Sequence, residues 1–72
     1  MTSEELSFSV FCIESVAERL GLPGNKVYDM LTEDSDILYQ YIVPCYEPLH
    51  TQSRQYIVDE ICSVLNERGI AV

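Results

Sequence analysis

Basic residues are scarce in this sequence of 72 residues. Positive charge comes from Arg19, Lys26, Arg54 and Arg68, against twelve acidic residues, so the formal net charge is −8. Proteins that bind nucleic acids neutralise phosphates with Lys and Arg, and anionic membrane surfaces attract the same side chains. The shortage therefore argues against nucleic acid and membranes as partners, and it leaves a protein with a basic surface as an allowed partner.

Long apolar runs and paired cysteine motifs are lacking too. No run approaches the ~20 apolar residues that span a bilayer. Residues 1–5 carry two glutamates and no basic residue, unlike the basic start of a signal peptide. Cys12, Cys45 and Cys62 are odd in number and show no CxxC spacing. We interpret them as small buried hydrophobic residues in a reducing compartment, and we expect a cytoplasmic protein.

Hydrophobic residues, in contrast, are plentiful for so short a chain. They make up 47% of it, which is too much for a disordered segment. Residues 1–72 are therefore predicted to form a single folded domain. A chain of this length buries only about 60% of its unfolded surface, so the apolar content also suggests a surface covered by self-association, and a homodimer is a candidate state.

The first half of the chain predicts two helices. The first begins near Ser3 and ends at Gly21, which supplies a left-handed residue ahead of Pro23. Its predicted buried stripe recurs at spacings of three and four residues and comprises Leu6, Val10, Ile13, Ala17 and Leu20, broadened by Cys12 and Val16. A short second helix, capped by Gly24 or Asn25, runs to Thr32.

The second half predicts two more helices. Ser35 or Asp36 caps a central helix with an apolar stripe of Ile37, Leu38, Tyr41, Ile42 and Cys45. Pro44 removes a backbone hydrogen bond and is expected to kink this helix rather than restart it. Thr51 or Ser53 caps the last helix, which ends at Gly69. No stretch shows the alternation of a strand, so the fold class is all-α: a small four-helix bundle with a Pro-kinked central helix.

The first two predicted helices resemble a helix-turn-helix pair. Ala17 lies inside the first helix, Gly21 lies at the turn, and Val27 and Leu31 pack the second helix back. Helices that read DNA present basic and polar side chains, whereas this one offers Lys26 alone among carboxylates. We therefore interpret the pair as two helices that pack against each other for structural reasons and do not bind DNA. A helix-turn-helix transcriptional regulator remains the alternative function.

No combination of residues completes a catalytic or metal site. His50 near Cys45 and Cys62 lacks the ligand spacing of a zinc site and the electropositive surround of a reactive thiol. Glu47, Asp59 and Glu60 could be imagined as an acid/base pair, but a domain this small is expected to have little room for a pocket of ~300 Å³. We predict no enzyme, no metal and no cofactor.

Two groups of residues are candidate sites. Phe8 and Phe11 are a candidate partner or dimer contact, because Phe11 falls on the polar side of its helix; a lone exposed aromatic is the alternative. The second group is a corner ahead of the last helix and comprises Pro44, Tyr46, Leu49, His50 and Thr51. We expect this corner to act as a structural hinge, with a recognition surface as the alternative.

Two segments resemble a family of small uncharacterised bacterial proteins. They are Tyr-Glu-Pro-Leu-His-Thr-Gln over residues 46–52 and Tyr-Ile-Val-Asp-Glu-Ile over residues 56–61, supported by residues 11–14 and 26–31. Ser53 stands where this family usually has a glycine, and Pro48 stands where other residues are commoner. The resemblance implies no established activity. It does imply genes beside those for ADP-ribosyltransferase-like, toxin-type proteins, and hence an accessory or antitoxin-like partner of such a protein.

The sequence therefore predicts a non-enzymatic, acidic protein-interaction module. Its expected partner is another protein, with an ADP-ribosyltransferase-like protein as a candidate and a second copy of the chain as another.

Overall fold

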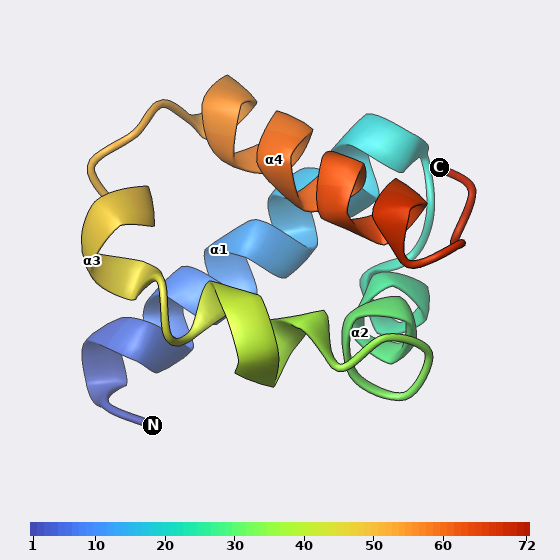
Figure 1. The fold of residues 1–72 in the computed structure, drawn as a ribbon. Coiled ribbons are helices and arrows are strands. Elements are labelled where there is room, and N and C mark those ends of the chain that lie inside the picture. The colour runs from blue at the N-terminus through green and yellow to red at the C-terminus, as the bar shows by residue number, and fades with distance from the viewer.

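The computed structural model describes all of residues 1–72, and every regular element in it is helical (Figure 1). The elements are α1 (Ser3–Leu20), α2 (Gly24–Thr32), the π-helical turn η1 (Leu38–Ile42), α3 (Tyr46–Leu49) and α4 (Arg54–Glu67). The prediction of an all-helical fold is confirmed. The predicted four-helix bundle is replaced by five segments, two of which have five residues or fewer.

Helix α1 begins at Ser3 with a capping box whose N-cap is Thr2, whereas the sequence favours the Ser3 hydroxyl as the cap. The backbone N–H of Glu5 donates to Thr2 Oγ1, and the N–H of Thr2 donates to the Glu5 carboxylate. This pair satisfies two of the free N–H groups at the helix start. Gly21 ends the helix in the left-handed conformation, at φ 67°, as predicted.

The buried face of α1 differs from the predicted stripe. Phe8, Cys12 and Val16 lie in the core, whereas Leu6 and Val10 are 57% and 45% exposed. Apolar residues occur all around this helix, so spacing alone does not select one face. Two buried serines complete the face: Ser9 donates to the carbonyl of Glu5, and Ser15 accepts a hydrogen bond from Arg54.

The predicted kinked helix is two separate segments. In η1 the N–H of Val43 donates to the carbonyl of Leu38, five residues earlier, at 3.0 Å. Pro44 follows directly and has no N–H to donate, so one backbone bond is missing there, and α3 begins two residues later. Pro48 lies in the first turn of α3, where N–H groups have no helical partner and proline is tolerated.

Helix α4 begins after Ser53 and ends shortly before Gly69, two positions that the sequence favours as its ends. Ser53, rather than Thr51, caps it by accepting from the N–H of Tyr56. Gly69, at φ 84°, reverses the chain, and the N–H of Ile70 donates to the carbonyl of Leu65. Arg68 reaches across to the carbonyl of Ser35 at 3.0 Å, which ties the end of α4 to the segment ahead of η1.

All five segments contribute side chains to one core. Figure 1 shows α1 running through the middle of the molecule, with α3, α4 and α2 arranged around it. Helix α1 packs against α2 and α4, and α2 packs against η1. The core has 15 buried residues, including Val27 and Leu31 of α2, which were expected to pack back onto α1. This arrangement places α3 beside the first turns of α1.

Candidate functional site

Four rings form a continuous row from α1 to α3, called here the aromatic row: Phe11, Phe8, Tyr46 and His50. The rings of Phe8 and Phe11 have centroids 6.3 Å apart, and Phe8 meets Tyr46 edge to face at 5.4 Å. Tyr46 stacks on His50 at 4.4 Å with an angle of 9° between the rings. The fold therefore joins the two groups of candidate residues that the sequence presents separately.

The members of the row differ in exposure. Phe8 is 9% exposed and belongs to the core, whereas Phe11 is 40% exposed, as its position on the polar side predicts. Tyr46 is half-buried and His50 is exposed. Within the aromatic row, most of the surface available to another molecule therefore comes from Phe11, Tyr46 and His50.

The protonation of the His50 ring follows from its backbone contacts. Its Nδ1 lies 2.9 Å from the carbonyl oxygen of Tyr46 and 2.8 Å from that of Glu47. Carbonyl oxygens only accept hydrogen bonds, so Nδ1 carries the proton. In the neutral ring, Nε2 is then left as an acceptor.

A surface cleft of about 520 Å³ lies beside the row, between the start of α1 and α3. It is called here the α1–α3 cleft, and it is lined by Ser3, Glu4, Ser7, Phe8, Tyr46 and His50. Glu4 is exposed and has no hydrogen-bond or ion-pair partner. The cleft therefore combines aromatic surface with one unpaired carboxylate.

The other corner residues support α3. Leu49 is buried in the core, and the hydroxyl of Thr51 donates to the carbonyl of Pro48 at 3.2 Å. Pro44 is exposed and lies in the turn between η1 and α3. Leu49 anchors the corner inside while Tyr46 and His50 face the cleft.

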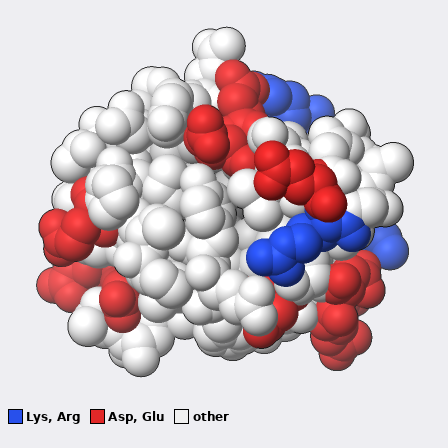
Figure 2. Space-filling view, in the orientation of Figure 1, with Lys and Arg blue, Asp and Glu red and all other residues white.

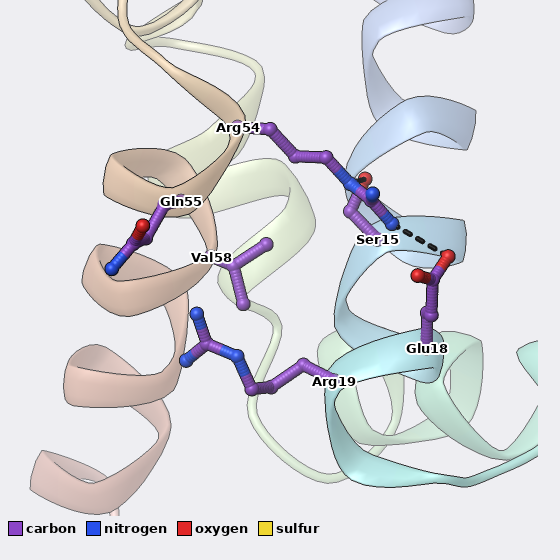
Figure 3. A pocket seen from close by; sticks show the side chains of 6 residues that line it. All are labelled: Ser15, Glu18, Arg19, Arg54, Gln55 and Val58. Atoms are coloured by element: carbon purple, nitrogen blue, oxygen red, sulfur yellow. Dashed lines mark hydrogen bonds and ion pairs between the residues drawn. The ribbon is translucent and has the colours of Figure 1, made fainter.

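Two arginines clamp α1 to α4 around a second cleft of about 370 Å³ (Figure 3). Arg54 of α4 donates to Glu18 at 2.7 Å and to Ser15 at 3.1 Å, both on α1. Arg19 of α1 donates to Asp59 of α4 at 2.8 Å. Charge patterning did not predict these pairs, because their members lie 36 to 40 residues apart.

A third cleft, of about 410 Å³, lies where the chain end meets α1 and α2. Its lining is mostly apolar and comprises Leu20, Leu22, Lys26, Met30, Asp34, Ile70, Ala71 and Val72. The expectation that this domain leaves little room for a space of ~300 Å³ is therefore wrong. All three spaces are surface clefts between helices, which a size argument based on a single core overlooks.

The three thiols are free. Burial raises the pKa of Cys12 to about 12, and burial also raises the pKa of Cys62. No group of three or more His, Cys, Asp or Glu side chains is placed to hold a metal ion. Unlike Cys12, which is fully buried, Cys45 and Cys62 are only half-buried, which corrects the expectation for those two.

Acidic side chains dominate the charged surface. Figure 2 shows acidic groups at the rim of a broad uncharged area, with basic groups confined to one side of this face. Burial and the nearby Glu60 carboxylate raise the pKa of Tyr41. No helix is both long and apolar enough to cross a membrane.

Comparison with known proteins gives one match. The model of a family described as "Protein of unknown function (DUF3791)" matches residues 7–68. No curated protein and no solved structure matches the chain. The match includes Phe8, Phe11 and the whole of α3, so both groups of candidate residues lie within the family domain.

Proposed function

This chain belongs to the DUF3791 family, and we propose that it is a non-enzymatic, acidic protein-interaction module. The observation that carries the proposal is the aromatic row, which leaves Phe11, Tyr46 and His50 accessible beside the α1–α3 cleft. Exposed aromatic rings next to a concave surface are typical of interface anchors. The row is therefore the surface through which we expect the protein to bind.

The partner that we propose is a protein with a basic surface. With a net charge of −8, the chain attracts positively charged molecules. An ADP-ribosyltransferase-like protein is the first candidate, in an accessory or antitoxin-like pairing, because the sequence resembles proteins encoded beside such enzymes. We propose a bacterial cytoplasmic setting, supported by the three free thiols.

The proposal is tested by calorimetric titration of that candidate with the purified protein and two single variants. Phe11→Ser removes an exposed ring of the row, and we expect it to weaken binding by about 2 kcal/mol or more. Val10→Ser is the matched control, because Val10 is similarly exposed on α1 but outside the row. Equal losses in both variants, or no effect of either, would argue against the row as the contact surface.

Self-association through the same surface is measured separately. Sedimentation of the wild-type chain and of Phe11→Ser over a range of concentrations reports the oligomeric state. A dimer that dissociates in Phe11→Ser alone would replace the basic partner with a second copy of the chain.

We rank a helix-turn-helix regulator second. Helix α2 presents Lys26 as its single basic residue, and Arg19, Arg54 and Arg68 already donate to groups within the chain. Few positive charges remain to neutralise phosphates. A gel shift at low salt tests the ranking: strong DNA binding that declines steeply with added salt would reverse it.

A further inference from the structure

The α1–α3 cleft has the chemistry to receive one basic side chain. We propose that it binds an arginine of the protein partner, with the guanidinium between Glu4 and the stacked rings of Tyr46 and His50. This inference rests on the proposed function, because it names the chemical group that the aromatic row recognises.

Glu4 supplies the charge for this contact. Its neighbour Glu5 is already used, because the Glu5 carboxylate accepts the backbone N–H of Thr2. Glu4 makes no such bond, yet it lines the cleft. A free carboxylate accepts two parallel hydrogen bonds from a guanidinium, and such charge-assisted pairs are the stronger ones.

The rings supply a flat surface and an acceptor. A guanidinium is planar and weakly hydrated, and it stacks on aromatic faces more readily than an ammonium does. His50 is held by its Nδ1 proton on two carbonyl oxygens, so its Nε2 is available to accept a hydrogen bond from the ligand. The two stacked rings and Glu4 therefore match the shape and the donors of an arginine better than those of a lysine.

None of the four basic side chains of the molecule lines this cleft. Arg19 and Arg54 pair with Asp59 and Glu18 in the cleft between α1 and α4. Arg68 donates to Ser35 and Gln40 at the far end of α4. Lys26 lines the cleft at the chain end, so no lysine or arginine of the chain occupies the α1–α3 cleft. The net charge of −8 favours the approach of a basic side chain from another molecule.

The probe is a five-residue glycine peptide with a central arginine, titrated into the isotope-labelled full chain and followed by two-dimensional NMR. The same peptide with citrulline keeps the shape and removes the charge. We expect saturable shifts at the amides of Ser3, Glu4, Ser7, Tyr46 and His50 with the arginine peptide, and much smaller ones with citrulline.

Two pairs of variants separate the site from the general acidity of the protein. Glu4→Gln should weaken binding of the arginine peptide about fivefold. Glu14→Gln, on the same helix but outside the cleft, should change the affinity by less than about twofold. Tyr46→Leu should weaken binding and Tyr56→Leu should not. Glu4→Gln changes only an exposed side chain, so its result stands even if Tyr46→Leu destabilises the fold.

Three results would overturn the inference: equal losses in Glu4→Gln and Glu14→Gln, equal shifts with citrulline, or shifts spread over the acidic surface. Failure of this inference is distinguishable from failure of the proposed function. If Phe11→Ser still abolishes binding of the partner protein while the arginine peptide leaves the cleft unshifted, the interaction module stands and arginine recognition is rejected.

Discussion

At the scale of single residues, His50 contacts both the backbone of α3 and the ring of Tyr46. Its Nδ1 closes the end of α3 by donating to two carbonyl oxygens, and its ring covers Tyr46. The sequence singled this residue out because it is the lone histidine ahead of a helix. Its backbone contacts could not be predicted, because they depend on α3 ending at Leu49.

Replacing His50 by alanine should lower the free energy of unfolding by about 1 kcal/mol, because one exposed hydrogen-bonding side chain is lost. Urea unfolding followed by circular dichroism measures the change. His50→Asn, which can still donate to a carbonyl, should recover part of it. A variant that no longer folds would instead bear out the structural hinge that the sequence led us to expect at this corner.

Cys12 should make stability depend on alkaline pH. Burial raises its pKa from 9.0 to about 12, so the folded chain keeps a proton that the unfolded chain releases above pH 9. The free energy of unfolding should therefore fall as pH rises from 9 towards 12, with this thiol adding a slope of up to about 1.4 kcal/mol per pH unit.

The check is urea unfolding at several pH values for the wild-type chain and for Cys12→Ala. Both contain the same five tyrosines, so the difference between their slopes isolates the thiol. Identical slopes would show that Cys12 does not have the raised pKa.

At the scale of elements, helix ends were easier to predict than helix faces. Gly21 and Gly69 end helices as expected, because only a few residue types adopt a positive φ readily. The buried face of α1 was only partly predicted, because apolar residues occur all around this helix and because serine counts as polar, although Ser9 and Ser15 lie in the core with their hydroxyls bonded. Their partners come from the helix backbone and from a distant arginine, and the latter contact is set by the tertiary fold.

The cap of α4 provides a test at this scale, since the sequence allowed Thr51 or Ser53. Ser53→Ala should lower the free energy of unfolding by about 1 kcal/mol, because the N–H of Tyr56 loses its acceptor. Thr51→Ala is the matched control and should cost clearly less, as its hydroxyl bonds only the exposed carbonyl of Pro48 in α3. Thermal unfolding of the two variants side by side decides the point; a larger loss in Thr51→Ala would contradict it.

The candidate site shows what one sequence can predict about a surface. Phe11 and the residues around His50 were identified because each is unusual in its own segment. Their connection through Phe8 and Tyr46 was not, because the two rings are 38 residues apart and meet only once α3 packs on α1.

At the scale of the whole molecule, electrostatic repulsion is the dominant effect of its charge. The molecule measures 27 × 22 × 21 Å, whereas the Debye length is about 30 Å at 0.01 M salt and about 8 Å at 0.15 M. At low salt, each carboxylate therefore interacts with nearly all the others. The two ion pairs between α1 and α4 are exposed and contribute little in comparison.

Adding salt should consequently stabilise the protein. Between 0.01 and 0.15 M sodium chloride, we expect the melting temperature to rise by about 4 °C or more, which corresponds to roughly 1 kcal/mol for a domain of this size. Scanning calorimetry at both concentrations measures the shift. A fall in the melting temperature would mean that the ion pairs of Arg19 and Arg54 stabilise the fold by more than the repulsion among the carboxylates destabilises it.

The π-helical turn η1 also bears on how relatives of this chain should be aligned. A π turn holds one residue more than an α turn between the same flanking positions, and the bond from Val43 to Leu38 encloses that extra residue. A homologue lacking one residue between positions 38 and 42 could close the same segment as ordinary α-helix while keeping Ile37 and α3 in place. We therefore expect single-residue gaps within this family to fall at η1, and an alignment that moves such a gap elsewhere would shift the aromatic row out of register.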